Sequence, residues 1–168
     1  LLHMGEDKMS KSLGNLISLD EGLSRYGADA MRIFFLSSHY RSPLTYTDEG
    51  VMANRRAAER LSNAFREGPS VGSGSLDPQP YKERFIQAMD SDLNTPQALA
   101  SLFDLARDIN RSREAGLQVE AAQSHLRDLG GILGLTFDTD PKTSKVESDP
   151  FIQLLVTTRT ELRSAKHY

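Results

Sequence analysis

The sequence predicts a mainly α-helical protein in which amphipathic helices form a small helical bundle. Apolar residues recur at three- and four-residue spacing along most of the 168 residues. The sustained alternation of apolar and polar residues that is typical of half-buried strands is lacking. Helix start signals recur between the apolar stretches, as in Ser18 followed by Glu21 and in Thr95 followed by Pro96. These observations favour helices over sheet.

The first part of the chain carries signals for three helices. A short helix is expected between a capping box that begins at Ser18 and a glycine stop at Gly27. A second helix with a dense apolar face is expected over about residues 29–38. Thr47 is placed to cap a longer third helix that ends near Glu67. The apolar stripe of this third helix is expected to consist of Val51, Ala58, Leu61 and Phe65.

The second part of the chain carries signals for a three-helix bundle. Residues 68–80 are rich in glycine, proline and serine and lack apolar periodicity, so they are expected to form a flexible linker at the main domain boundary. Amphipathic helices are expected over residues 81–90, from Thr95 to a glycine stop at Gly116, and over about residues 118–129. Such helices with short connections form a small bundle.

Composition and charge exclude several classes of protein. No apolar run approaches the roughly 20 residues that a membrane-spanning helix needs. The chain contains no cysteine and four scattered histidines, which excludes disulfides and gives no metal-binding spacing. The formal net charge is −3, so there is no global cationic field and any contact with RNA must be local. Both chain ends are expected to be cut from a longer protein, because no leader sequence opens the chain and a helix pattern runs into its end.

One short segment carries residues suited to chemistry on phosphates. The sequence Lys-Met-Ser-Lys-Ser at residues 8–12 is flanked by Gly5 and Gly14. The ammonium groups of Lys8 and Lys11, on a loop bounded by glycines, are what binding a polyphosphate requires. For an arbitrary pair of lysines at this spacing, a solvated surface loop is the commoner explanation.

The complete motif is more specific than the pair of lysines. Lys-Met-Ser-Lys-Ser followed by Leu-Gly-Asn at residues 13–15 resembles the signature loop of class I aminoacyl-tRNA synthetases. In that family the loop follows the last strand of a Rossmann-type catalytic domain and closes over ATP. The resemblance implies that Lys11 and then Lys8 are the catalytic, ATP-contacting residues, with Ser10 and Ser12 as further ATP-binding groups.

Three further blocks narrow the family. Tyr-Gly-Ala-Asp-Ala-Met-Arg at residues 26–32, residues 36–44, and the block at residues 85–99 that contains Asp-Leu-Asn-Thr-Pro keep the order found in the cysteine–tRNA ligase family. The matches run from residue 3 to about residue 135. The chain is thus similar to the C-terminal part of that family, which ends in a DALR-type helical domain.

This resemblance implies both an activity and its partners. The full-length family activates cysteine with ATP as cysteinyl-AMP and transfers it to tRNA(Cys), and the enzyme is expected to be a cytoplasmic monomer without membrane association. The family selects cysteine with a zinc ion, whose ligands are expected to lie outside these 168 residues. The isolated chain is therefore expected to be inactive.

The resemblance also implies a domain organisation. Five segments are expected: the end of the catalytic domain with the signature loop at 1–17, a helical stem-contact region at 18–67, the linker at 68–80, a DALR-like tRNA-binding bundle at 81–135, and a mobile segment with a truncated last helix, opening near Pro150, at 136–168.

Two other functions remain open at this level. The cysteine ligase of mycothiol synthesis shares the signature loop but joins cysteine to an amino sugar, and a stand-alone helical RNA-binding or interaction module would lack the catalytic half. The Asp-Leu-Asn-Thr-Pro block at residues 92–96 and the well-developed helical region favour the tRNA ligase.

Several charged residues have a structural as well as a functional interpretation. Arg32 is expected to pair with Asp29, three residues earlier on one helix. Arg41 is a candidate phosphate contact, and Asp90 and Asp92 are expected to cap a helix rather than hold magnesium. Four arginines either meet the tRNA backbone or form ordinary solvated surface: Arg107, Arg111, Arg113 and Arg127.

Overall fold

The computed structural model describes only part of the chain. The described residues are 2–4, 7–8, 18–67, 74–137 and Thr157. The chain divides into two compact units, residues 1–138 and residues 139–168. The second unit is described at Thr157 alone, which is helical, so the helix expected to open near Pro150 lies outside the described residues. The fold below is that of the first unit.

The first two helices follow the local signals. Helix α1 spans Leu19–Tyr26, and the Ser18 hydroxyl accepts a hydrogen bond from the Glu21 backbone N–H at 3.1 Å. Gly27 has φ = 87°, a conformation that glycine adopts without strain. The chain therefore turns sharply into helix α2, Ala28–Leu36. The capping box and the glycine stop are confirmed.

Helix α3 spans Asp48–Asn63 and is capped as predicted, with the Thr47 hydroxyl accepting from the backbone N–H three residues on at 3.0 Å. The predicted end at Glu67 is wrong by four residues. Of the predicted stripe, Val51 and Leu61 are buried, and Ala58 and Phe65 are half-buried and pack against the core. Ala57, which was not predicted to belong to the stripe, is buried as well. Neighbouring helix positions lie about 100° apart, so the neighbours that pack on the helix decide which of two adjacent alanines is buried.

Three short strands form a small sheet that the sequence did not predict. Strands β1 (Leu2–Met4), β2 (Asp7–Lys8) and β3 (Leu44–Tyr46) lie in the order β2-β1-β3. Strand β1 pairs antiparallel with β2 and parallel with β3. Strands of two or three residues are too short to show alternation, so pairing between distant segments forms this sheet.

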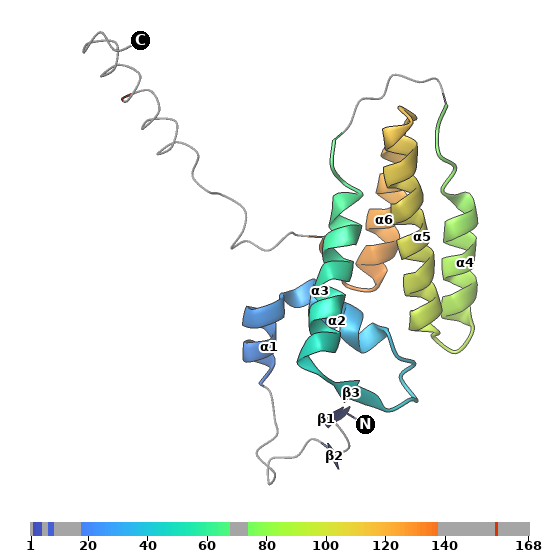
Figure 1. Ribbon diagram of the computed structural model, residues 1–168. Coiled ribbons are helices and arrows are strands. Elements are labelled where there is room, and N and C mark those ends of the chain that lie inside the picture. Colours follow the sequence, from blue (N-terminus) through green and yellow to red (C-terminus); the bar gives the residue numbers. More distant parts are fainter. Residues whose placement is uncertain (1, 5–6, 9–17, 68–73, 138–156, 158–168) are drawn as a thin grey trace. The chain divides into compact units, whose positions relative to one another are not determined.

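Three helices form the predicted bundle, with α4 and α6 on either side of α5 in Figure 1. They are α4 (Gln79–Asp90), α5 (Thr95–Glu114) and α6 (Glu120–Ile132). The Asn94 side chain accepts from the Gln97 backbone N–H at 3.2 Å and caps α5. Among the described residues, no helix is both long and apolar enough to cross a membrane.

The C-terminal part of the predicted linker is ordered. Gln79 and Pro80 belong to α4, not to the linker expected over residues 68–80. The Leu76 N–H donates to the Gln118 carbonyl at 3.1 Å, and the Gln118 N–H donates to the Gly74 carbonyl at 2.9 Å. Residues 74–76 are thus held by backbone bonds to Gln118, a distant residue, which their own composition does not reveal.

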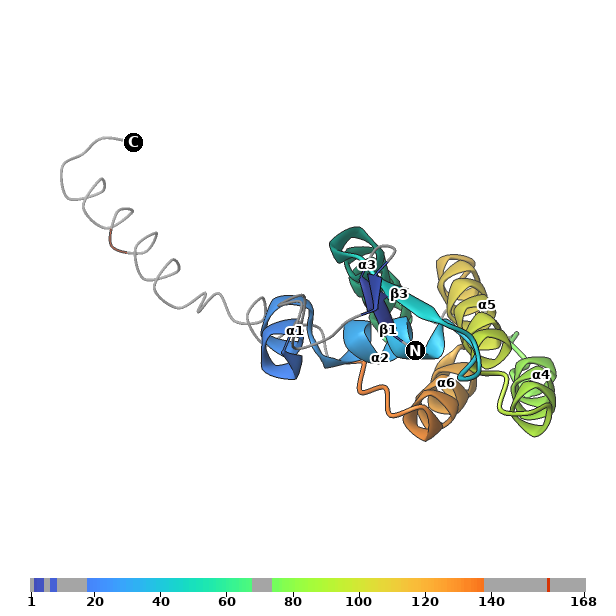
Figure 2. The ribbon, with the colours of Figure 1, turned by 90° about the horizontal axis from the view of Figure 1, so that it is seen from below.

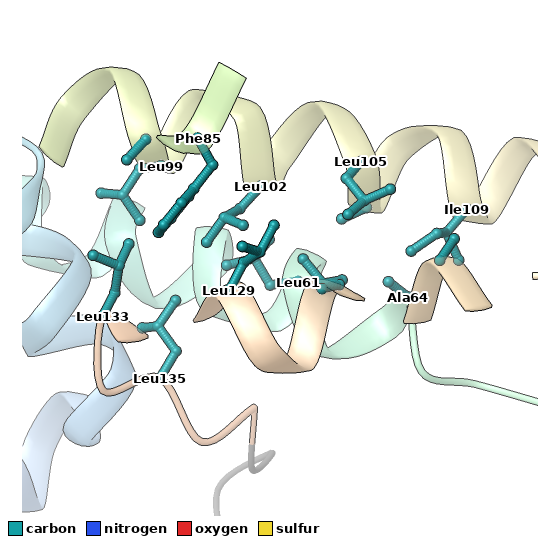
Figure 3. Close-up of a cluster of buried hydrophobic side chains, with 14 of the residues drawn as sticks. Leu61, Ala64, Phe85, Leu99, Leu102, Leu105, Ile109, Leu129, Leu133 and Leu135 are labelled. Carbon is teal, nitrogen blue, oxygen red and sulfur yellow. The ribbon is translucent and has the colours of Figure 1, made fainter. Parts of the chain in front are cut away.

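One hydrophobic core joins helices from both sides of the predicted linker. Figure 3 shows Leu61 of α3 and Ala64, the residue that caps its C-terminal end, beside the side chains of the bundle in one core cluster. The bundle contributes, among others, Phe85, Leu99, Leu102, Leu105, Ile109, Leu129, Leu133 and Leu135. A smaller cluster forms around α1, α2 and β3 and consists of Tyr26, Ala30, Met31, Phe34, Tyr46 and Val51. Helix α3 contributes to both clusters, because Leu61 lies in the main core and Val51 in the smaller cluster.

The segment after α6 returns to α2. The backbone N–H groups of Thr136 and Phe137 donate to the Asp29 carboxylate at 3.0 and 2.7 Å. Asp29 is only 8% exposed, and Arg32 pairs with it at 3.3 Å as predicted. Thr136 and Phe137 were expected to open a mobile segment, but a carboxylate more than a hundred residues away holds both of them. The rest of that expected segment, apart from Thr157, lies outside the described residues. We call Asp29, Thr136 and Phe137 the clasp.

Candidate functional site

The structure defines both ends of the signature loop. Residues 9–17 lie outside the described residues, and so do the side chains of the four predicted site residues Lys8, Ser10, Lys11 and Ser12. The backbone of Lys8 is described in β2, where it pairs with His3 of β1. Beyond the loop, the chain is described again from the α1 cap at Ser18. The loop therefore connects the edge strand β2 to the start of α1 (Figure 1). Figure 2 shows α1 together with strands β1 and β3 from below.

A cluster of hydrogen-bonding side chains joins the elements beside these loop ends. The hydroxyls of Tyr26 and Tyr46 each donate to Asp48 Oδ1 at 2.9 Å, and Arg25 Nη2 lies 3.1 Å from Asp48 Oδ2. Tyr26 ends α1, Tyr46 ends β3, and Asp48 begins α3. Because β3 pairs with β1, this tyrosine–aspartate cluster links α1 to the sheet that carries the other loop end.

The protonation states of the cluster follow from these contacts. The hydrogen bonds from Tyr26 and Tyr46 hold the pKa of the Asp48 carboxyl below its usual range. Burial, with hydrogen bonds to Tyr26 and Asp48, raises the pKa of the Tyr46 hydroxyl. Tyr46 thus stays protonated and donates, while Asp48 stays ionised and accepts. The sequence predicted only the Thr47 cap here, and no local pattern indicates that Asp48 would gather two tyrosines.

The Asp48 contacts predict a specific dependence of stability on pH. Asp48 stabilises the fold fully above the pKa of an unfolded aspartate, about 3.9, and this contribution is lost as the pH falls through the lower pKa of the folded state. We expect a smaller difference in unfolding free energy between about pH 7 and about pH 3 in Asp48→Asn than in the parent. Urea denaturation at both pH values measures this difference.

The control for this pH prediction is Asp128→Asn, which removes one negative charge at an exposed position of α6. If both variants lose stability on acidification as steeply as the parent, the proposed role of Asp48 is wrong.

A second polar cluster joins the loop after α2 to the turn between α4 and α5. Tyr40 donates to Asp92 Oδ1 at 2.7 Å, and Arg41 Nη2 contacts the same oxygen at 3.3 Å. His39 Nε2 lies 3.1 Å from the Asp92 carbonyl oxygen. The hydrogen bond to Asp92 raises the pKa of Tyr40. We call these four residues, His39 to Arg41 and Asp92, the latch.

The latch corrects one expectation and shows the surroundings of a second candidate. Asp92 was expected to cap α5, but Asn94 is the cap and Asp92 has φ = 55°, a left-handed conformation outside the helix. Arg41, a candidate phosphate contact, has a side chain that is 68% exposed, and its guanidinium also contacts Asp92 and the Tyr40 hydroxyl, the latter at 2.8 Å, so its contact with phosphate stays a prediction. The signal that was missed is a pairing over about fifty residues, which no local pattern encodes.

We expect loss of the Asp92 carboxylate from the latch to lower the melting temperature modestly. Asp92→Asn keeps a residue that tolerates left-handed backbone but removes the charge, so we expect the melting temperature to fall by roughly 2 °C. Circular dichroism melting measures this shift. Asp90→Asn, at an exposed position two residues earlier, is expected to melt like the parent. If Asp92→Asn and Asp90→Asn both melt at the parent temperature, the latch contributes nothing to stability.

The four candidate tRNA-facing arginines differ in their surroundings. Arg107 pairs with Asp104, and Arg111 pairs with Asp108 at 2.8 Å. The other two arginines make contacts within the fold. The Arg127 guanidinium lies 4.7 Å from the centroid of the Phe65 ring. Arg113 donates to the Asn63 and Arg66 backbone carbonyls at 3.1 and 2.9 Å. Arg113 therefore satisfies carbonyls at the end of α3, a structural role that spacing did not predict.

The described residues do not fit a zinc site. The chain has no cysteine, and within the described ranges no group of three or more histidine, aspartate or glutamate side chains could hold a metal. No step of the chemistry below is assigned to a metal held by this chain.

Comparison with known proteins matches two parts of the chain. Residues 1–56 match the family described as tRNA synthetases class I (C) catalytic domain. Residues 84–138 match the family described as DALR domain. The two matches include the signature loop and most of the bundle.

Three relatives that match almost the whole chain are cysteine–tRNA ligases. The cysteine–tRNA ligase of Dehalococcoides mccartyi strain 195 is 47% identical over 170 residues, which cover 100% of this chain and 37% of the relative. Those of Alkalilimnicola ehrlichii and Halorhodospira halophila are 43% and 42% identical over 175 residues, 99% of this chain in each case and 38% and 37% of the relatives. This chain thus spans little more than a third of the length of the curated relatives it matches. By its sequence blocks, its helical fold and these similarities, the chain belongs to the cysteine–tRNA ligase family.

Proposed function

We propose that this chain is the part of a cysteine–tRNA ligase that closes over ATP and docks tRNA(Cys). The whole enzyme activates cysteine as cysteinyl-AMP and then esterifies the 3′ end of the tRNA. The observation that carries the proposal is Lys-Met-Ser-Lys-Ser at residues 8–12, within a segment similar to a class I catalytic domain and in a chain 47% identical to a cysteine–tRNA ligase. We assign the whole enzyme to the cytoplasm and as a monomer.

The chemistry assigned to the loop is electrostatic. A cysteine carboxylate oxygen attacks the α-phosphorus of ATP, the bond to the bridging oxygen of the β-phosphate breaks, and pyrophosphate leaves. The nucleophile is already ionised, so this step needs no general base. Lys11, supported by Lys8, stabilises the negative charge that develops on the phosphates, and Ser10 and Ser12 donate hydrogen bonds to them.

We assign each segment of the chain a role in the whole enzyme. We assign residues 1–17 to the end of the catalytic domain, residues 18–67 to a region that contacts the tRNA stem, and residues 81–135 to the tRNA-binding bundle. Residues 68–80 connect the last two, and residues 136–168 lead out of the bundle. Zinc, where the family uses it to select cysteine, would be held by residues outside this chain, because the chain has no cysteine.

A chimera tests the proposed function. The 168 residues replace the matching segment of the Dehalococcoides mccartyi ligase, whose remaining length supplies the rest of the enzyme. We expect the chimera to catalyse cysteine-dependent ATP–pyrophosphate exchange and to charge tRNA(Cys), and we expect the 168-residue chain alone to catalyse neither. A folded chimera that neither exchanges pyrophosphate nor charges tRNA, beside an active parent enzyme, would overturn the proposal.

A further inference from the structure

A hollow of about 350 Å³ lies between α3 and α5, two neighbouring helices (Figure 1). Its volume is in the range of small-molecule sites. It brings together two guanidinium groups, two side-chain amides and one phenyl ring, a combination that the sequence analysis did not identify. The lining residues are Arg60, Asn63, Phe103, Ala106, Arg107 and Asn110.

One wall of the hollow is a flat aromatic surface faced by a cation. Phe103 is half-buried and packs against the main core, so its ring is held in place. The Arg60 guanidinium lies 5.7 Å from the ring centroid, and the Arg60 residue is exposed. The small, buried Ala106 leaves the space beside the ring open. A planar ligand can stack on the guanidinium or take its place on the ring.

The other end of the hollow is rich in hydrogen-bond donors because of Arg113. Arg113 Nη2 donates to Asn110 Oδ1 at 2.6 Å, which orients this amide and leaves its NH₂ group available as a donor. Arg113 Nη1 also holds the Asn63 backbone carbonyl at 3.1 Å. Within the described part of the chain, the Asn63 side-chain amide makes no hydrogen bond. The Asn110 amide is therefore held by Arg113, and both amides line the hollow with groups left to bind a ligand.

The charge around the hollow favours an anion. Arg60, Arg107 and Arg113 contribute three positive charges at or beside it. Asp104 pairs with Arg107 and is shared with Arg84 at 2.9 Å. A ligand with a flat ring, hydrogen-bond acceptors and a negative charge matches these groups. A nucleotide has all three features.

We propose that this hollow holds one unpaired nucleotide of the docked tRNA. The base stacks against Phe103 and Arg60, its edge bonds to the Asn63 and Asn110 amides, and its phosphate lies against Arg107. Bases within a duplex are stacked and cannot enter such a hollow, whereas unstacked bases of RNA loops are recognised by aromatic rings and arginine planes. The inference rests on the proposed function only in taking tRNA as the partner. A free nucleotide has the same chemistry, so the test separates the two sources.

The first test measures the affinity of the 168-residue chain for a tRNA(Cys) transcript at one fixed salt concentration. We expect Phe103→Leu, which keeps apolar volume but removes the aromatic face, to weaken binding about tenfold. Arg60→Gln leaves the core untouched and is expected to weaken binding to a similar extent, about tenfold. The matched control is Arg56→Gln, which removes the same charge from an exposed position of α3 outside the hollow and is expected to stay within about twofold.

The second test follows the side-chain amide signals of Asn63 and Asn110 by NMR. We expect saturation with the tRNA transcript to shift both signals, and millimolar AMP, CMP, GMP or UMP to leave them in place. Shifts with the mononucleotides but not with tRNA would identify a free-nucleotide site and overturn the proposal. Unmoved signals at saturating tRNA, or unchanged affinity in both Phe103→Leu and Arg60→Gln, would overturn it too. The chimera assay judges the proposed function separately, because it measures catalysis and not occupation of the hollow.

Discussion

Replacement of Lys11 by alanine in the chimeric ligase is expected to lower the rate of cysteine-dependent ATP–pyrophosphate exchange by at least about a hundredfold. The reason is that the ammonium group is assigned to charge that develops on the phosphates as the carboxylate attacks. Interactions made mainly in the transition state lower kcat when they are removed and change substrate binding little. We therefore expect the affinity for tRNA(Cys) to stay within about twofold of the parent chimera.

Three further variants sharpen the Lys11 test. Lys8→Ala is expected to lose less activity than Lys11→Ala, because Lys8 is assigned a supporting role. Lys11→Arg keeps the charge and is expected to retain part of the rate. Lys82→Ala removes a lysine from α4, far along the chain from the loop, and is expected to exchange pyrophosphate at the parent rate. Full activity of Lys11→Ala would remove the assignment of the loop to ATP.

Loss of the Asp29 carboxylate is expected to lower the free energy of unfolding by about 3 kcal/mol. Asp29 is 8% exposed and accepts hydrogen bonds from the Thr136 and Phe137 backbone N–H groups at 3.0 and 2.7 Å. It also contacts the Thr136 hydroxyl and the Arg32 guanidinium, each at 3.3 Å. In Asp29→Ala these donors lose their shared acceptor, and two of them are backbone groups that cannot turn away.

Two measurements test the clasp. Urea denaturation gives the unfolding free energy of Asp29→Ala, of Asp29→Asn, which keeps one oxygen and is expected to lose less, and of the exposed control Asp128→Asn, which is expected to stay within about 0.5 kcal/mol of the parent. Hydrogen exchange at the amides of Thr136 and Phe137 gives a local readout, since both are expected to exchange faster without the carboxylate. Parent-like stability together with parent-like exchange in Asp29→Ala would contradict the role of the clasp.

The clasp also explains how the end of the bundle is shaped. Phe137 has φ = 58°, and its ring packs on Phe65 with the ring centroids 4.9 Å apart. The ring occupies the space beside Gly130, where a β-carbon would collide with it. The bonds to Asp29 thus hold a strained residue in place and bring the chain after α6 back against α2.

Local chemistry in the sequence was sufficient to predict most of the helices and the family. The Ser18 and Thr47 caps, the turn at Gly27 and the start at Thr95 depend on groups within four residues of one another, so their patterns survive in the sequence. Apolar spacing predicted the stripes that became the core, and contiguous blocks carried the resemblance to the ligases. The signature loop was recognised in the same way, as an unbroken string of residues.

Tertiary packing decided the features that join distant segments. Strand β3 depends on pairing with β1, the clasp brings Asp29 to Thr136, and the latch brings Tyr40 to Asp92. The hollow exists only because α3 and α5 pack side by side, which places Arg60 over Phe103. A carboxylate or an arginine meets partners that lie fifty to a hundred residues away only after the core has formed. No spacing along the chain encodes these contacts, because the packed core sets the position of each group and the local sequence does not.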